Sequence, residues 1–572
     1  MKNAHPFHAL LLPLLGLASA LPSQENLELG KMWTFENPPL DHLKKEYGFA
    51  PNQKWIDTLR LASLRFGNWC SSSFVSPKGL IMTNHHCARD NIAAVSPPGK
   101  DWVENGFYAS SLEDEVRLMS RRGAEVEPVS VQQLVSMKDV TAAMNEGLGS
   151  NDDDATVNAK REKNEEAILE AAKAEHANLT AQVVKIHQGA IFQLYLYKVW
   201  DDIRLVCAPH LQTAHFGGDP DNFTYPRYSI DFAFVRAYED GKPADTSSHY
   251  FRWKNGGAKE NDLVFVTGNP GSTGRLLTHA QLEYMRDAQH PIQLSMIDNQ
   301  LKIVRQFSER DPNLAKALRQ NMLSLENSQK ALGGYQSGVL DESLMAAKRQ
   351  SEAAFKAKVA ADPRLQRAYG QVWDQLAEIA VEKTKLEAKL GFYSPSYGFP
   401  LVRAFAIAIA VNPDMSEEDR QEARQQALKP ARRMHALYMA LFIDHLTRAR
   451  EFLGDDDPYV KATLGGTDPI SAARNILQSK VSQDKFVKDL LDGGAAAVAA
   501  SEDAAIVIAR VIAPLAEQYG KLSEALDVRE SVQGALLGQA LHAVYGDKVS
   551  PDATMTLRFS DGLVKGYPYN GT

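Results

Sequence analysis

The chain has 572 residues, of which 44% are hydrophobic and 23% are charged, and its formal net charge is −8. Its 63 basic residues are spread without clusters, which excludes the basic footprint expected of a protein that binds nucleic acid or anionic lipid. A chain of this length is sufficient for about three or four domains, each with its own core.

Residues 1–20 have the three parts of a secretory signal peptide. Lys2 supplies positive charge, residues 9–17 form an apolar run, and Ala18-Ser19-Ala20 offers the small residues of a cleavage site. The run is shorter than the roughly 20 residues that a membrane-spanning helix needs. We therefore predict a secreted or periplasmic protein without a membrane anchor.

The three cysteines of the chain allow one disulfide. Cys70 and Cys87 flank a predicted β-hairpin whose turn is Ser76-Pro77-Lys78-Gly79, because proline presets the turn and glycine relieves it. We predict a disulfide between these two residues. Cys207 lies in the apolar sequence Leu-Val-Cys-Ala, and we expect it to be buried and inert.

The predicted hairpin delivers the pair His85-His86 directly before Cys87. A pair of histidines is more often part of an ordinary loop, and zinc would need further ligands that no His-Glu-x-x-His or paired Cys-x-x-Cys motif supplies. No metal is therefore predicted. The arrangement resembles the way in which chymotrypsin-fold proteases hold their general base, so we predict that His86 has this role.

Residues 21–280 show mainly strand signals, in short apolar runs broken by turn residues. An exception is the charged segment at about 138–190, which predicts one or two inserted helices. The polar loop 216–227 is a candidate site because it is rich in turn residues and carboxylates. Asp231 follows this loop at the entry to an apolar strand, where a carboxylate would be buried and rigid, as the partner of a catalytic histidine must be. Asp219 and Asp221 are alternative candidates for this role, but their surroundings are more solvated.

Helical periodicity dominates residues 281–545. Val372, Leu376, Ile379 and Leu386 share one helical face, and Ser416 with Asp419 fits a capping box. Strand signals return in 546–572, where Asp561-Gly562 predicts a hairpin turn. Because a lone hairpin cannot complete a β domain, we expect the second β unit to be incomplete.

Several segments together resemble the bacterial dipeptidyl-peptidases 7 and 11, with dipeptidyl aminopeptidase BII, which are secreted chymotrypsin-fold serine exopeptidases. The matching segments are Thr83-Asn84-His85-His86-Cys87, Phe216-Gly217-Gly218-Asp219-Pro220-Asp221-Asn222 through Asp231-Phe232, Gly268-Asn269-Pro270-Gly271-Ser272-Thr273 and Thr556-Leu557-Arg558. The resemblance implies an α+β fold: a double β-barrel in 21–280 and 546–572, with an inserted all-α cap domain in 281–545 that limits cleavage to dipeptides.

The resemblance also implies roles for single residues. His86 would be the general base, and Asp231 the carboxylate that orients it. Asn222, Phe223 and Asn327 would hold the amino terminus of the substrate, although Phe223 stands where the family usually has tryptophan and so lacks an indole N–H. No cofactor is implied, and a homodimer is expected.

The sequence departs from the family pattern at the nucleophile, since it contains no Gly-Asn-Ser-Gly or Gly-Asp-Ser-Gly segment. The decoy Gly268-Asn269-Pro270-Gly271-Ser272 has proline where the serine should stand, and proline offers neither a nucleophile nor an N–H for an oxyanion hole. Ser272 is therefore a weak candidate. We expect a truncated family member that is inactive in this form.

These observations predict a serine-type dipeptidyl-peptidase that releases N-terminal dipeptides from oligopeptides with a free amino terminus. Two interpretations of the chain stay open: a fragment of an active enzyme, or a non-catalytic protein that binds peptide amino termini. A chymotrypsin-like endopeptidase is disfavoured because the helical insertion would block long substrates. The residue preference at the cleavage site is not predicted, because the residues that choose it are absent from the sequence.

Overall fold

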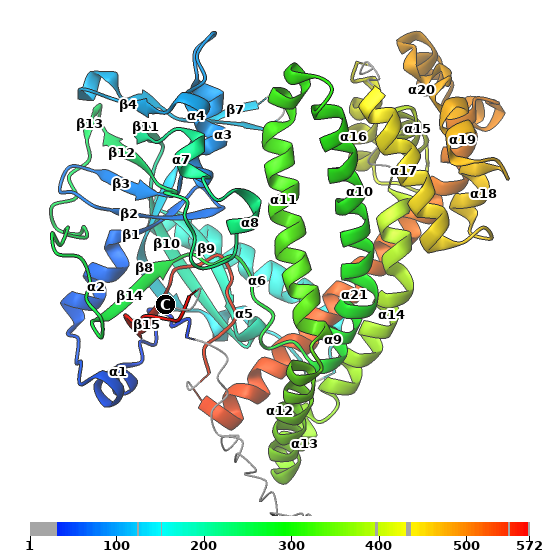
Figure 1. Cartoon of the computed structure of the whole chain (residues 1–572). Helices are drawn as coiled ribbons and strands as arrows, with labels where there is room; N and C mark the ends of the chain where they lie inside the picture. Colours follow the sequence, from blue (N-terminus) through cyan, green and yellow to red (C-terminus); the bar gives the residue numbers. More distant parts are fainter. Residues whose placement is uncertain are drawn as a thin grey trace, which may run out of the picture.

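The computed structural model describes residues 31–122, 125–149, 151–394, 399–430, 436–546 and 549–569. The predicted signal peptide therefore lies outside the described residues. Figure 1 shows a β-rich part, built from the N-terminal half and the C-terminal strand, beside a part made of long helices. The mixed α and β content predicted from the sequence is confirmed.

The β-rich part is an antiparallel sheet of eleven strands within the described ranges. Its main path runs β4-β11-β12-β3-β2-β1-β8-β10-β9, with β13 paired to β12 and β5 paired to β11. These strands are β1 (Ser63–Phe66), β2 (Cys70–Phe74), β3 (Leu80–Thr83), β4 (Phe107–Tyr108), β5 (Val116–Arg117), β8 (Val131–Asp139), β9 (Thr180–Ile186), β10 (Ile191–Trp200), β11 (Asp202–Ala208), β12 (Ala233–Glu239) and β13 (Lys242–Pro243). A separate ribbon pairs β6 (Met119–Arg122) with β7 (Glu125–Pro128).

The predicted hairpin forms between β2 and β3, with Ser73 opposite Met82. Gly79 has a φ of 65°, which a side chain would strain, and the Ser76 hydroxyl accepts hydrogen bonds from two backbone N–H groups of the turn. Strand β3 also pairs with β12. Residues 85 and 86 closely follow β3, and residue 231 lies shortly before β12. The pairing of the two strands therefore brings these residues together.

Helices of 4 to 22 residues lie in the same part of the sequence as these strands. They are α1 (Leu40–Tyr47), α2 (Gln53–Ala62), α3 (His85–Val95), α4 (Trp102–Asn105), α5 (Thr141–Met144), α6 (Asp154–Glu175), α7 (Leu211–Ala214) and α8 (Gly218–Asp221). The expected helical insertion at 138–190 is wrong in its last part, where β9 pairs along its length with β10. The β-branched residues Val183 and Val184 suit a strand that another strand covers.

The predicted turn at Asp561-Gly562 is also wrong. Strand β15 (Arg558–Leu563) runs straight through it and pairs with β14 (Leu263–Gly268). The physical reason is that the Asp561 side chain is fully buried and accepts hydrogen bonds from the N-terminal segment, including Trp33 Nε1 at 2.7 Å and Tyr47 Oη at 2.6 Å. Burial of this carboxylate among donors overrides its usual preference for a turn.

The helical part comprises α9 (His279–Tyr284), α10 (His290–Ser308), α11 (Pro312–Leu340), α12 (Glu342–Ala361), α13 (Pro363–Tyr369), α14 (Val372–Tyr393), α15 (Phe399–Ala410), α16 (Glu417–Leu428), α17 (Ala436–Leu453), α18 (Pro458–Leu464), α19 (Pro469–Leu477), α20 (Asp484–Ala500) and α21 (Ala504–Tyr545). The predicted apolar face of α14 packs into a core, with Val372, Leu376 and Ile379 buried. Ser416 caps α16 as predicted. The exact domain boundaries stay predictions.

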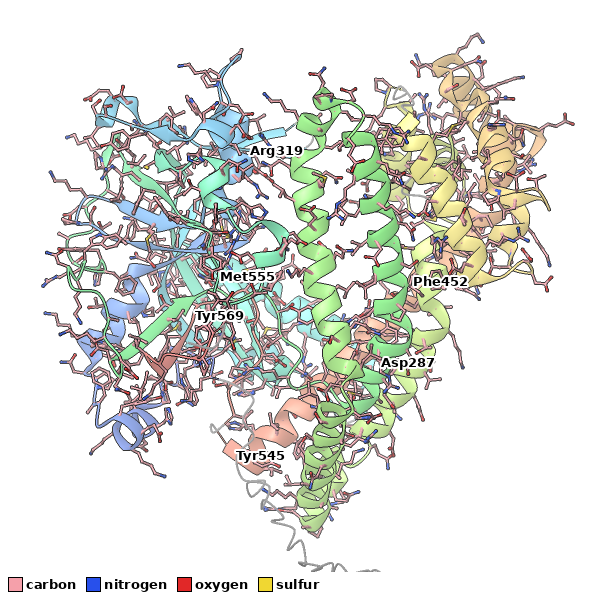
Figure 2. The ribbon with its side chains drawn as sticks, viewed as in Figure 1. Asp287, Arg319, Phe452, Tyr545, Met555 and Tyr569 are labelled. Carbon is pink, nitrogen blue, oxygen red and sulfur yellow. A yellow bond between two sulfur atoms is a disulfide. The ribbon has the colours of Figure 1, made fainter. Side chains whose placement is uncertain are left out.

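Two helices join the helical part to the β-rich part. Helix α11 does so through polar groups: Arg319 pairs with Glu104 at 2.9 Å and with Asp101 at 3.3 Å, and Figure 2 shows it between α11 and the sheet. Helix α21 packs closely on the turn at 187–189, where Gly538 faces the His187 backbone. Within the described ranges, no helix is long and apolar enough to cross a bilayer.

Candidate active site

The first turn of helix α3 places its two histidines in different surroundings. His85 is buried, and its Nε2 has no hydrogen-bond partner among the described residues. Burial disfavours the charged ring and lowers the pKa of His85 to about 4, so this residue is neutral at physiological pH. The His86 side chain is 53% exposed. Only His86 can therefore meet a substrate in solution.

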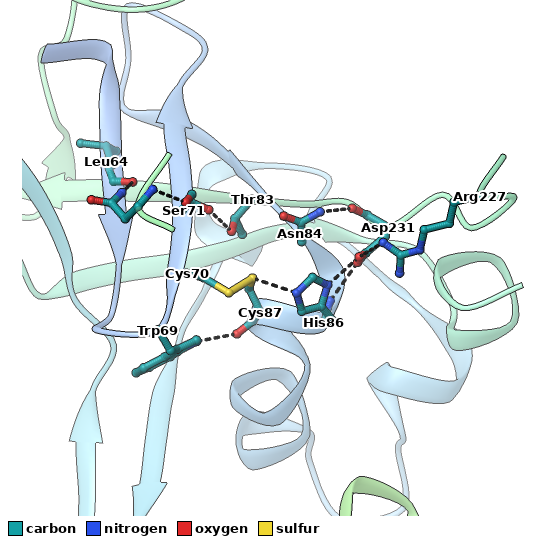
Figure 3. Close-up of a disulfide and its surroundings, with 11 residues drawn as sticks. Leu64, Trp69, Cys70, Ser71, Thr83, Asn84, His86, Cys87, Arg227 and Asp231 are labelled. Carbon is teal, nitrogen blue, oxygen red and sulfur yellow. Dashed lines mark hydrogen bonds and ion pairs between the residues drawn. A yellow bond between two sulfur atoms is a disulfide. The ribbon is translucent and has the colours of Figure 1, made fainter. Parts of the chain in front are cut away.

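His86 is held by Asp231, as the sequence led us to expect for a catalytic pair (Figure 3). Its Nδ1 lies 2.6 Å from Asp231 Oδ2, and its backbone N–H donates to Asp231 Oδ1 at 3.0 Å. The Asn84 amide donates to the backbone carbonyl of Asp231 at 3.0 Å. These three contacts hold Asp231, which precedes β12, against the start of α3, which carries His86.

The Asp231 carboxylate is 6% exposed, and its burial alone would raise its pKa. The hydrogen bonds and charge of His86, together with the charge of Arg227, outweigh burial and lower the pKa of Asp231 to about 2. Arg227 Nη1 lies 3.2 Å from the same oxygen that faces the imidazole. The carboxylate is therefore ionised and able to fix the proton on Nδ1 of His86.

The predicted disulfide forms between Cys70 and Cys87. The other ring nitrogen of His86, Nε2, lies 3.5 Å from Cys87 Sγ. The two sulfurs and an imidazole nitrogen lie within 4.8 Å of one another, but both sulfurs are in the disulfide and offer no thiolate to a metal. Cys207 is half-buried rather than fully buried, because it does not share the buried positions of β11, which Ile203, Leu205 and Ala208 take.

The predicted substrate-binding asparagines are 105 positions apart, and the structure brings them into contact. Asn222 Nδ2 donates to Asn327 Oδ1 at 3.0 Å. Beside them, Lys330 Nζ donates to the carbonyls of Asp219 at 2.7 Å and Pro220 at 2.8 Å, which holds α11 on α8. The grouping therefore spans the two parts of the molecule.

Phe223 follows this contact directly, in a left-handed conformation with φ of 59°, and its side chain is 63% exposed. A large ring that is left in water next to two amides offers a surface on which a ligand can stack. The roles of Asn222, Phe223 and Asn327 stay predictions.

The weak nucleophile candidate, Ser272, is not brought to the imidazole. It is exposed and forms an isolated bridge with Thr554. Within the described residues, the ring nitrogens of His86 contact only Asp231 and Cys87.

Sequence reasoning missed the role of Arg227. An arginine in a polar loop is usually solvated, but its position four residues before the buried Asp231 was a usable signal.

The chain can now be compared with known proteins. A model of the peptidase S46 family matches residues 28–572. This chain belongs to the peptidase S46 family. The resemblance identified from the sequence is confirmed by this match.

Relatives of the S46 chain include an Asp/Glu-specific dipeptidyl-peptidase of Shewanella putrefaciens, 30% identical over 354 residues. That match covers 59% of the S46 chain but 47% of the relative, so the chain spans about half of that protein. Dipeptidyl-peptidase 7 of Capnocytophaga gingivalis is 26% identical over 554 residues, covering 90% of the S46 chain and 73% of the relative.

Among solved structures, the S46 chain is similar to Porphyromonas endodontalis DPP11 in complex with the dipeptide Arg-Glu. The TM-score is 0.71 at 20% sequence identity, and the match covers 95% of the S46 chain and 82% of that structure. At 20% sequence identity, this structural similarity supports a shared fold. The chymotrypsin-like description of the sheet stays a prediction.

Proposed function

We propose that this chain carries the acid–base pair and the substrate grip of a serine-type dipeptidyl-peptidase, which releases dipeptides from the free amino terminus of oligopeptides. The observation that carries the proposal is the 2.6 Å contact between the half-exposed imidazole of His86 and the buried carboxylate of Asp231. Family membership supports peptidase chemistry, because the named relatives are dipeptidyl-peptidases.

In this mechanism Asp231 keeps the proton of His86 on Nδ1, so Nε2 is free to take a proton from a serine hydroxyl. The hydroxyl oxygen then attacks the peptide carbonyl, and His86 returns the proton to the leaving amine. Asp231 stabilises the imidazolium between these steps, since its low pKa keeps it ionised. Water releases the dipeptide from the acyl-enzyme by the same route.

The free amino terminus would be read by the pair Asn222 and Asn327. An ammonium group has three N–H donors and needs acceptors. Asn222 contacts Asn327 through its amide nitrogen, and its Oδ1 accepts no hydrogen bond from the described residues. This oxygen is therefore available as an acceptor for the ammonium group. The exposed ring of Phe223 would pack on the first residues of the peptide.

We also propose that the serine nucleophile is not among these 572 residues, so this form does not turn over substrate. Two observations support this: the sequence has no Gly-Asn-Ser-Gly or Gly-Asp-Ser-Gly segment, and His86 Nε2 meets Cys87 rather than a hydroxyl among the described residues. The second candidate function, a non-catalytic protein that binds peptide amino termini, is favoured by the intact contact of Asn222 with Asn327.

Export to the periplasm or the medium is part of the proposal. The Cys70–Cys87 disulfide is compatible with an oxidising compartment, in which such bonds persist. A homodimer is proposed from the family resemblance alone.

The deciding experiment measures release from a panel of fluorogenic dipeptidyl substrates with free amino termini. The purified chain is compared with His86→Ala and Ser272→Ala, and each protein is checked for cooperative melting. We expect no release, together with millimolar or tighter binding of N-terminally free peptides that acetylation of the amine abolishes.

Release that His86→Ala abolishes would show that a nucleophile is present, and its loss in Ser272→Ala would identify Ser272. A folded chain that neither cleaves nor binds free amino termini would contradict both candidate functions.

A further inference from the structure

The disulfide beside His86 is placed to take part in chemistry of its own. Figure 3 shows the imidazole between two partners, with Asp231 on its Nδ1 side and the Cys70–Cys87 bond on its Nε2 side. The 3.5 Å between Nε2 and Cys87 Sγ is within hydrogen-bonding range for sulfur. If the bond opens, Cys87, His86 and Asp231 form a continuous thiol–imidazole–carboxylate array.

A second feature favours negative charge on Cys87. It is the third residue of α3, an eleven-residue helix, and the partial positive charge of a helix amino terminus stabilises a nearby thiolate. A protonated imidazole, itself balanced by the ionised Asp231, supplies a full positive charge at the same sulfur. Two independent elements of the structure thus stabilise the same leaving group.

The two cysteine residues differ in exposure. Cys87 is 6% exposed, whereas Cys70 is partly exposed. An external thiolate therefore reaches Cys70 more easily, and attack on Cys70 expels Cys87, which is the sulfur next to His86.

We propose that the Cys70–Cys87 disulfide is a thiol–disulfide exchange site for dithiol reductants, with His86 stabilising the Cys87 leaving group. The reductant thiolate forms a bond to Cys70 Sγ as the Cys70–Cys87 bond breaks, and the electron pair of that bond stays on Cys87 Sγ. The proton released by the attacking thiol is held on His86 Nε2. The second thiol of the reductant then attacks the reductant sulfur bonded to Cys70, the electron pair of the broken bond stays on Cys70 Sγ, and this sulfur takes the proton of the second thiol. The reductant leaves as a disulfide and the chain holds two reduced cysteines.

Reduction has a direct consequence for the imidazole. A protonated Nε2 that is paired with a thiolate cannot accept a proton from a hydroxyl. The reduced chain therefore loses its general base, and the disulfide acts as a redox switch on the His86–Asp231 pair. The exchange chemistry itself does not depend on peptidase activity, so the proposed function and this inference can fail separately.

The test follows reduction of the folded chain by dithiothreitol at pH 7, with free thiols trapped by a maleimide and counted at each cysteine by mass spectrometry. We expect His86→Ala to be reduced about tenfold more slowly than the unaltered chain, because its leaving thiolate loses the imidazolium. The control variant His249→Ala removes a histidine elsewhere in the sequence and should leave the rate unchanged. Equal rates for His86→Ala and the unaltered chain would overturn the proposal.

A second measurement needs no variant and so stands even if His86→Ala fails to fold. The reduced chain is alkylated with iodoacetamide between pH 5 and 9, and the rates at Cys87 and Cys207 are compared. Burial raises the pKa of Cys207, which makes it an internal reference. We expect Cys87 to stay reactive at least one pH unit below Cys207. Coinciding profiles would overturn the proposal.

Discussion

At the scale of single residues, Asp231 shows how charge outweighs burial. An isolated buried carboxylate would be protonated more easily than one in water. Here the His86 ring, the His86 backbone N–H and Arg227 all surround the carboxylate, and their combined effect lowers its pKa to about 2 from the ordinary 3.8. A lowered pKa in the folded state means that ionisation of Asp231 stabilises the fold.

This linkage predicts the pH dependence of an Asp231→Asn variant. The contribution of the ionised carboxylate is complete above about pH 4 and disappears as the pH falls to about 2. We expect the variant to lose about 2 kcal/mol of unfolding free energy at pH 7, since each pKa unit corresponds to about 1.4 kcal/mol. Urea unfolding at a series of pH values checks this, and an undiminished difference at pH 2.5 would contradict it.

A second prediction concerns Asn327. Replacing it with alanine removes the acceptor of the Asn222 amide and frees that side chain to rotate. We expect Asn327→Ala to weaken binding of N-terminally free peptides about tenfold, the cost of roughly one hydrogen bond to a charged group. Ser328→Ala, its exposed neighbour on α11, is the control. Calorimetric titration measures both, and equal affinities would argue against the amine-binding role.

The candidate site was largely readable from the sequence, because its residues lie in short, distinctive segments. His86 follows a hairpin with a cysteine directly after it, and Asp231 stands where a polar loop meets an apolar strand. The partnership of Asp231 with Arg227 was not readable, because nothing local shows whether a loop arginine turns toward solvent or toward a buried carboxylate.

At the scale of elements, strand β15 depends on the N-terminal segment. The Asp561 side chain accepts hydrogen bonds from Lys31, Trp33, His42 and Tyr47. Burial would raise the pKa of Asp561, but these donors lower it to about 2. The sequence suggested a turn at this position because the donors are more than 500 positions away, beyond the reach of any local pattern. Strand β9 was missed for a different reason, because the helical interpretation of the charged segment before it was extended to residue 190, although β9 pairs with the adjacent β10.

We therefore expect Asp561→Ala to destabilise the fold by about 3 kcal/mol, because it removes a buried carboxylate and leaves its partly buried donors, Trp33 and Tyr47 among them, without an acceptor. Glu260→Ala, an exposed carboxylate close to β14 in sequence, is the matched control and should be within about 0.5 kcal/mol of the unaltered chain. Denaturant unfolding compares the two. A small effect of Asp561→Ala would show that β15 is held without this carboxylate.

At the scale of the whole molecule, the two parts are joined by contacts of different kinds. Helix α11 has no buried residue and meets the β-rich part through polar pairs, whereas α21 packs its glycines against the turn at 187–189. A methyl group at Gly538 would overlap the carbonyl oxygen of His187, while one at Gly520, in the same helix, meets no atom within 4 Å.

This difference gives a matched pair of variants. Gly538→Ala should destabilise the protein by about 2 kcal/mol through overpacking, and Gly520→Ala should stabilise it by about 0.8 kcal/mol because alanine favours the helix. Thermal unfolding of both variants measures the effect. Stabilisation by both would mean that α21 is not tightly packed on the turn.

The double attachment of Asp231 has an evolutionary consequence. Because the same carboxylate receives the backbone N–H that starts α3, selection for a correctly folded helix preserves the aspartate whether or not the protein cleaves anything. The imidazole of His86 contributes to stability only through its contact with Asp231, starts no helix, and is half exposed to water. In a lineage that abandoned proteolysis, position 86 would drift first and position 231 would persist. Retention of the histidine at position 86, rather than of the aspartate at position 231, therefore indicates that a family member cleaves peptides or descends recently from one that did.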